Sequence, residues 1–226
     1  MSGFDLVIFD CDGVLVDSEP LSAEAIQTVL RDGGIEVPLE AIWRCVGMKQ
    51  ADIVAHLERE TGQTIGNLLV DNLWPATRAL FAGRLQTTRG LKPFLDALTT
   101  RRCLASSSTH ERIGFSLGIT GLDSYFPAAS RFSSSDVRHG KPAPDLFLHA
   151  AARMGADPGK CLVIEDSRYG IMAAVAAGMT ALGYVGGSHS TPASAAALTA
   201  CGAYGIAPTW ADVAERLALA GSTAAD

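Results

Sequence analysis

Two aspartates follow directly on an apolar segment near the start of the chain, at a spacing that suggests chemistry. The segment Phe4–Phe9 is mostly apolar and runs into Asp10 and Asp12, which Gly13 follows. A continuous run of Val, Ile and Phe predicts a strand buried on both faces of a sheet. Two carboxylates at the end of such a strand repel each other unless a cation or a proton compensates the charge. The pattern therefore indicates a site, and a metal site in particular.

Polar side chains also follow three further segments that we predict to be buried strands. The hydroxyl run Ser106–Thr109 follows the second strand, Lys141 follows the third, and Glu165 with Asp166 ends the fourth. In open α/β sheets, ligands bind beyond the carboxyl ends of the strands. If these strands are neighbours, the carboxylates, the lysine and the hydroxyl groups converge on one point.

This combination of groups fits the transfer of a phosphoryl group. Several carboxylates need a hard divalent cation, and proteins typically hold Mg²⁺ by carboxylates together with substrate phosphate and water. One aspartate can attack phosphorus to give an aspartyl-phosphate. A second aspartate, two residues further on, can act as general acid and then as base for water. A lysine offsets negative charge, and a serine at a helix start binds phosphate oxygens.

Each motif has an ordinary structural explanation when it is taken alone. An Asp-x-Asp-Gly sequence is common in turns, a Ser-Ser-Ser-Thr run usually caps a helix, and Glu-Asp-Ser is most often a helix cap. A Lys-Pro pair carries no information by itself. All four motifs in this order, each after a buried strand, favour the functional interpretation.

The rest of the sequence predicts the elements that position these groups. Residues 17–87 show helical patterning without a convincing strand, whereas strands and helices alternate from Gly90 onward. Such alternation predicts a parallel sheet with helices on both faces. We therefore predict an α/β fold, with a Rossmann-like catalytic core made of residues 1–16 and 88–226. Residues 17–87 are predicted to form a small, inserted, all-helical cap domain.

Together, these residues resemble the four motifs of the haloacid dehalogenase (HAD) superfamily of phosphohydrolases. The motifs are Asp10-Cys-Asp12-Gly-Val, Ser106, Lys141-Pro-x-Pro-Asp145 and Glu165-Asp166-Ser-x-x-Gly170. The resemblance covers nearly the whole chain, and the helical insert after the first motif is similar to the small cap of the β-phosphoglucomutase-like phosphatases. It implies the HAD fold, dependence on Mg²⁺ and an aspartyl-phosphate intermediate.

The resemblance assigns catalytic roles to three residues. Asp10 is expected to be the nucleophile and a Mg²⁺ ligand. Asp12 is expected to be the general acid and base, with its backbone carbonyl also on Mg²⁺. Lys141 is expected to pair with the phosphoryl group and with Asp10.

The resemblance also implies which residues bind phosphate and metal. Ser106, with Ser107 beside it, is expected to bind the phosphoryl group, although similar proteins have Ser-Asn where this chain has Ser-Ser. Asp166 is expected to ligate Mg²⁺, while Glu165 either ligates the ion or holds a metal-bound water. The departure at Ser107 leaves the exact substrate open.

The sequence discriminates further within the superfamily. Asp12 and the Glu165-Asp166 pair argue against dehalogenase chemistry, which lacks the second aspartate and needs no Mg²⁺. The β-phosphoglucomutases carry a histidine ten residues after the general acid, and Ser22 occupies that position here. The whole-chain pattern looks most similar to bacterial 6-phosphogluconate phosphatase-like proteins. It predicts hydrolysis of a small phosphorylated metabolite, a sugar phosphate or phosphogluconate. A phosphomutase and a non-catalytic metabolite-binding protein are the alternatives.

One cap residue is a candidate for recognising the substrate. Lys49 lies in a loop, Gly47–Gln50, that reaches down to the active site in similar proteins. Its ammonium group could bind a carboxylate or hydroxyl of a sugar phosphate. A solvated lysine at a helix start is the competing explanation.

Composition limits the partners and the compartment. The net charge of the 226-residue chain is −6, which disfavours nucleic acid and anionic membranes as partners. No apolar stretch is long enough to span a bilayer, and the N-terminus lacks the pattern of a signal peptide. The five cysteines are scattered and form no Cys-x-x-Cys pair. We expect a cytoplasmic protein that is a monomer or a weak homo-oligomer.

Overall fold

A computed structural model describes residues 3–45, 48 and 50–222 of the chain. It contains a six-stranded sheet in which every strand runs parallel to its neighbours, in the order β3-β2-β1-β4-β5-β6. The strands are β1 (Leu6–Phe9), β2 (Arg101–Ser106), β3 (Arg131–Ser133), β4 (Cys161–Glu165), β5 (Thr180–Tyr184) and β6 (Gly205–Ala207). The strands that carry the predicted motifs are therefore neighbours, because β1 lies between β2 and β4.

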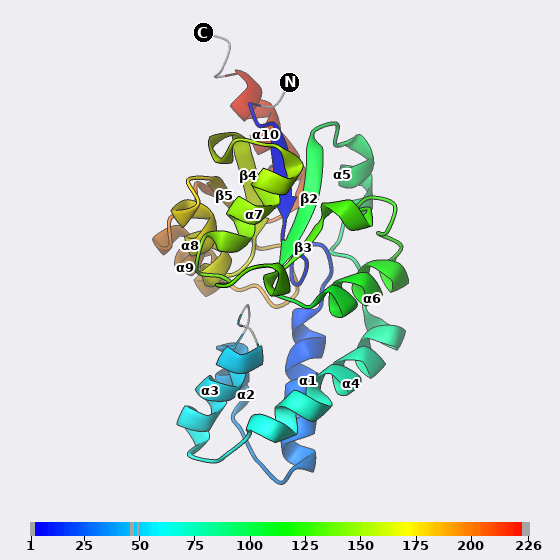
Figure 1. Ribbon diagram of the computed structural model, residues 1–226, viewed down its shortest axis with the longest axis vertical. Coiled ribbons are helices and arrows are strands. Elements are labelled where there is room, and N and C mark those ends of the chain that lie inside the picture. Colours follow the sequence, from blue (N-terminus) through cyan, green and yellow to red (C-terminus); the bar gives the residue numbers. More distant parts are fainter. Residues whose placement is uncertain (1–2, 46–47, 49, 223–226) are drawn as a thin grey trace.

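Helices cover both faces of this sheet (Figure 1). They are α5 (Leu91–Ala97), α6 (His110–Thr120), α7 (Asp145–Met154), α8 (Arg168–Ala176), α9 (Pro192–Ala200) and α10 (Trp210–Ser222). Short 3₁₀ turns at Ala128–Ser130, Ser134–Asp136 and Pro158–Lys160 complete the connections.

Strand β1 is buried on both faces, as its apolar sequence predicts. Val7 and Phe9 join one apolar cluster, which includes residues of α5, α6 and α10. Leu6 and Ile8 join the other, which includes residues of α7, α8 and α9. Because side chains alternate along a strand, a central parallel strand needs apolar residues at every position.

The segment between β1 and α5 is helical and has an apolar core of its own. Its helices are α1 (Glu19–Asp32), α2 (Leu39–Trp43), α3 (Gln50–Thr61) and α4 (Gly66–Arg84). Leu30, Leu57 and Leu69 are fully or almost fully buried in that core. Figure 1 shows these helices as a separate body beside the carboxyl ends of the strands. The predicted fold class, a Rossmann-like core with an inserted helical cap, is confirmed; the boundaries at residues 17 and 87 stay predictions.

Helix α4 contains a proline in its interior. It begins at Gly66, ends at Arg84 and continues through Pro75. The burial of Leu69, Leu73 and Phe81 against the other cap helices and the core holds it in place. Tertiary packing of an apolar face thus outweighs the unfavourable proline.

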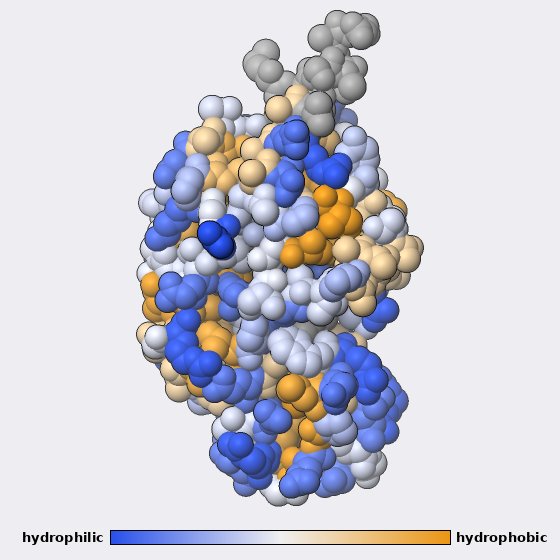
Figure 2. All heavy atoms as spheres, turned by 180° about the vertical axis from the view of Figure 1, so that it is seen from behind, coloured by the Kyte–Doolittle hydropathy of each residue, from blue (hydrophilic) through white to orange (hydrophobic). Residues whose placement is uncertain are grey.

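None of the helices in the described part of the chain is long and apolar enough to cross a bilayer. Figure 2 shows hydrophilic residues over much of the rear face, with separate hydrophobic patches on the core and the cap.

Thr88 lies in the segment that returns from the cap to the core, and its side chain connects this segment to the core by hydrogen bonds. Its side chain is almost fully buried. Its hydroxyl donates a hydrogen bond to the carbonyl oxygen of Val14 (2.6 Å) and accepts one from Nε1 of Trp210 (2.9 Å). One hydroxyl therefore joins the turn after β1 to α10.

We expect Thr88→Val to lower the free energy of unfolding by about 1–3 kcal/mol, because it leaves a buried carbonyl and a buried indole N–H without partners. Chemical denaturation measures the change. Thr199→Val, at an exposed position of α9, is the control, and we expect it to change stability little. Equal effects of the two substitutions would contradict the role of Thr88.

Candidate active site

The predicted motif residues line one cavity of about 250 Å³ between the sheet and the cap. The core contributes mostly polar groups, and the cap contributes a mostly apolar roof. The core residues are Asp10, Asp12, Ser106, Ser107, Ser108, Thr109, Glu111, Arg112, Lys141, Asp166 and Ser167; the cap residues include Glu19, Ser22, Ile26, Ile42, Leu73 and Trp74. The structure thus brings together Asp10, Asp12, Ser106, Ser107, Lys141 and Asp166, which the sequence predicts as site residues of the core, and Glu165 lies directly behind them.

Lys141 is buried between two carboxylates. Its Nζ donates a hydrogen bond to Oδ1 of Asp10 at 2.7 Å and another to Oε1 of Glu165. Its side chain is only 2% exposed and also packs over the ring of Phe147. Burial lowers the pKa of Lys141, but the two carboxylates raise it by more, so the net shift is upward. The lysine is therefore a permanent positive charge at the end of β1.

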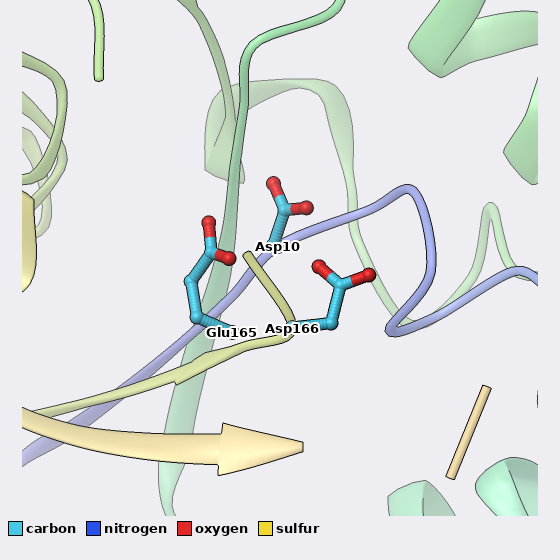
Figure 3. Close-up of side chains that lie close together, drawn as sticks. All are labelled: Asp10, Glu165 and Asp166. Carbon is cyan, nitrogen blue, oxygen red and sulfur yellow. The ribbon is translucent and has the colours of Figure 1, made fainter. Parts of the chain in front are cut away.

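Three carboxylates gather around this point, those of Asp10, Glu165 and Asp166 (Figure 3). One oxygen from each lies within 4.8 Å of the others. Burial and the neighbouring carboxylates raise the pKa of Asp10 and of Asp166 well above the usual range. One lysine does not balance three acids, so a divalent cation would relieve this repulsion. An all-oxygen donor set fits a hard cation.

Asp12 lies outside this cluster and has a separate set of partners. Ser108 donates a hydrogen bond to its Oδ2 at 2.6 Å, and Nη2 of Arg112 donates one to its Oδ1 at 2.8 Å. Burial raises the pKa of Asp12, but these partners lower it by more, and the net shift is downward. The same Nη2 donates to Oγ of Ser22 in the cap at 2.9 Å. Asp12 is thus held as a carboxylate that faces the cavity.

The hydroxyl run after β2 forms a rigid edge of the cavity. Oγ of Ser106 accepts a hydrogen bond from the backbone N–H of Ser108 at 3.0 Å. The hydroxyls of Ser133 and Ser134 donate to the backbone carbonyls of Ser108 and Ser107, both at 2.7 Å. The loop at the end of β3 therefore fixes the backbone that carries the predicted phosphate-binding residues.

Two glycines allow the acids to take these positions. A Cβ atom at Gly170 would lie 1.8 Å from Oε1 of Glu165, and one at Gly13 would lie 1.8 Å from Oδ2 of Asp166. Gly13 also has a φ of +76°, which disfavours other residues. Ser167 holds the other oxygen of Glu165 through its backbone N–H and its hydroxyl.

Sequence reasoning missed the roles of several cavity residues. Arg112 lies in the first turn of α6, where the helix dipole disfavours a cation, and that anomaly was the available signal. Glu19 begins α1; its burial and the negative charges of Asp12 and Asp166 raise its pKa to about 8. The predicted substrate-reading residue Lys49 lies outside the described residues.

Comparison with known proteins identifies the family. The model of the haloacid dehalogenase-like hydrolases matches residues 4–178. The chain belongs to this family. It is 32% identical to the 6-phosphogluconate phosphatase of Escherichia coli K12 over 194 residues, which are 85% of this chain and 87% of that protein. It is also 32% identical to the fructose-1-phosphate phosphatase of the same bacterium, over 78% of this chain and 94% of that protein.

A solved structure agrees with this assignment. A HAD family hydrolase from Deinococcus radiodurans, with bound phosphate and sodium, is 33% identical and superposes with a TM-score of 0.79. The match covers 98% of each chain. The predicted enzyme class, a HAD-like phosphoric monoester hydrolase, is confirmed.

We expect Gly170→Ala to displace the carboxylate of Glu165 and, through it, Lys141. The variant should lose most phosphatase activity and some stability, since the added methyl group occupies the position of a carboxylate oxygen. Phosphate release and thermal unfolding measure the two effects. Gly114→Ala in α6 is the matched control, because its Cβ meets no atom within 4 Å. That variant should keep activity and gain up to about 1 kcal/mol of stability. Full activity of Gly170→Ala would refute the packing argument.

Proposed function

We propose that the protein hydrolyses the phosphate ester of a small phosphorylated metabolite, a sugar phosphate or phosphogluconate, through an aspartyl-phosphate on Asp10. The arrangement of Asp10, Lys141 and Asp12 on the floor of one cavity carries this proposal. The two E. coli relatives, a 6-phosphogluconate phosphatase and a fructose-1-phosphate phosphatase, support a substrate of this class.

We propose Mg²⁺ as the cofactor, held by Asp10 and Asp166, with the backbone carbonyl of Asp12. Glu165 either ligates the ion or holds a metal-bound water, and its two hydrogen-bonded oxygens favour the indirect role. When bound, Mg²⁺ supplies positive charge that offsets the carboxylates and the substrate phosphate. One carboxylate oxygen each of Asp10, Glu165 and Asp166 lies within 4.8 Å of the others, which is close enough to share one ion. The carboxylate of Asp12 is engaged by Arg112, so only the backbone carbonyl of this residue is proposed for the ion.

The first chemical step is attack of the Asp10 carboxylate on phosphorus. The bond from phosphorus to the leaving oxygen breaks as the bond to Asp10 forms, and Asp12 gives its proton to the leaving alcohol. Asp12 is ionised in the arrangement described above. A bound phosphate dianion adds negative charge nearby and raises its pKa, which favours the acid form. Ser106, Ser107 and Lys141 hold the phosphoryl oxygens meanwhile.

The second step is hydrolysis of the aspartyl-phosphate. Asp12 takes a proton from water, the water oxygen bonds to phosphorus, and the bond to Asp10 breaks. This releases inorganic phosphate and restores Asp10. The contact with Arg112 favours the carboxylate form that this step needs.

The position of Ser22 favours a phosphatase over a phosphomutase. In this structure Ser22 accepts a hydrogen bond from Arg112, so a serine–arginine pair occupies the place where the mutases have a histidine. The product separates the two activities, since a phosphatase releases free phosphate and a mutase accumulates an isomeric sugar phosphate. Absence of turnover on a broad panel of phosphate esters would instead favour a metabolite-binding protein.

We further propose a cytoplasmic protein, monomeric or weakly self-associating, whose partner is the metabolite rather than nucleic acid or membrane. The net charge of −6 supports the exclusion of nucleic acid and anionic membranes as partners.

Asp10→Asn should reduce Mg²⁺-dependent phosphate release by roughly 10³-fold or more, because the amide cannot act as nucleophile. A screen of phosphorylated metabolites, read by phosphate release, provides the assay. Asp5→Asn, at an exposed position just before β1, is the control and should keep full activity. Retained activity in a folded Asp10→Asn variant would rule out the proposed mechanism.

Asp12→Asn should slow both chemical steps, by roughly 10²–10⁴-fold, since it removes the group that moves both protons. Rapid-quench kinetics separates formation of the phosphorylated enzyme from its hydrolysis. A variant that slows only one of these steps would mean that a different group serves the other.

A further inference from the structure

One histidine beside the metal centre is not used by the proposed mechanism. His189 lies in the loop of residues 186–190, which follows β5. Its side chain is only 6% exposed, and its Nε2 lies 3.0 Å from Oδ2 of Asp166, a carboxylate that is itself 3% exposed. A buried imidazole thus contacts a predicted metal ligand from outside the carboxylate cluster.

Nε2 of His189 is a close polar neighbour of Oδ2 of Asp166. This oxygen is buried and has no hydrogen-bond partner in the described part of the chain, so the 3.0 Å approach of Nε2 is a polar contact without hydrogen-bond geometry. Figure 3 shows one oxygen of Asp166 turned toward Asp10, while the other points away from Asp10 and Glu165. Partners outside the ligand shell commonly hold a ligating carboxylate in its orientation, and losing them weakens metal binding.

Close packing keeps the imidazole at this position. A Cβ atom at Gly187 would lie 2.8 Å from Nδ1 of His189 and 2.9 Å from the carbonyl oxygen of Gly13. A Cβ atom at Gly13 would lie 3.0 Å from Cε1 of His189. Both glycines therefore leave the space that the histidine occupies against Asp166.

The same loop is also anchored where the cap leaves the core. The backbone N–H of Ser188 donates a hydrogen bond to Oδ1 of Asp17 at 3.0 Å. Asp17 stands two residues before the start of α1. Inside the loop, the N–H of Ser190 donates to the carbonyl of Gly187 at 3.0 Å. Neighbouring residues of one loop thus contact two places. His189 contacts the metal centre, and Ser188 contacts Asp17, in the segment just before α1 that we call the root of the cap.

We propose that His189 is a positioning residue of the metal centre, which orients Asp166 through a loop that Asp17 fixes at the root of the cap. This inference rests on the metal centre of the proposed function. The imidazole holds the outer oxygen of Asp166 and leaves the inner oxygen directed at the ion. Because the loop is anchored at Asp17, the position of the histidine is tied to the start of the cap.

The test is calorimetric titration of the full chain with MgCl₂, and separately with MnCl₂, in the absence of substrate. His189→Leu should weaken affinity for the ion by roughly 10- to 100-fold, in the range seen for outer-shell partners. His189→Asn retains an N–H donor and should recover much of the affinity. His139→Asn is the control, since His139 also lies near a carboxylate, that of Asp145, but is exposed.

Asp17 gives a second, independent variant. Asp17→Ala leaves the imidazole in place and removes the anchor of its loop, so affinity for Mg²⁺ should fall in the same direction by a smaller factor. Asp17→Asn keeps an oxygen acceptor and should bind as the wild type does. In the double variant with His189→Leu the two losses should not add, because both act on the same contact.

The outcomes separate this inference from the proposed function. Wild-type affinity in folded His189→Leu, or in folded Asp17→Ala where His189→Leu fails to fold, overturns the positioning role alone. A lower melting temperature without a change in affinity for the ion would show that His189 only packs, and would overturn it too. A wild-type chain that binds neither ion overturns both proposals. Catalytic failure of Asp10→Asn leaves the calorimetric result unaffected.

Discussion

The ammonium group of Lys141 holds two buried carboxylates together at the carboxyl end of the sheet, and the arrangement of the cavity depends on it. Asp10 and Glu165 come from neighbouring strands, and without a shared cation their burial would be strongly unfavourable. The lysine cannot also neutralise Asp166. The remaining negative charge favours a divalent cation, and in the proposed function the cation and Lys141 would together attract the substrate phosphate.

This constraint reaches beyond the charged groups. Glu165 fits only because residue 170 has no side chain, and Ser167 holds its second oxygen. Asp12 lies two residues after Asp10 but outside the carboxylate cluster, and its carboxylate accepts hydrogen bonds from Ser108 and Arg112 instead. Two carboxylates at the end of one strand therefore have different environments, which suits one to attack phosphorus and the other to move protons.

Much of this arrangement could be predicted from the sequence, because it depends on local patterns. The uninterrupted apolar run of β1 predicts a central buried strand, and polar residues at the strand ends predict where the site lies. The contact between Arg112 and Asp12 could not be predicted, since it joins residues 100 positions apart. The cation in the first turn of α6 marks Arg112 as unusual, but it does not identify the partner. The contact of His189 with Asp166 could not be predicted either, because it joins a loop after β5 to the end of β4 through the packing of the core. The roof of the cavity, with Ser22 and Trp74, depends on how the cap packs on the core.

The central claim is that Asp10 carries the phosphoryl group during turnover. The most direct measurement is acid quench of the enzyme during steady-state hydrolysis of its best substrate with Mg²⁺, followed by mass spectrometry of the peptides. The account predicts one added phosphoryl group on the peptide that holds Asp10, and its disappearance when the substrate is exhausted. Turnover with no phosphoryl group on Asp10, or with the group on another residue, would contradict it.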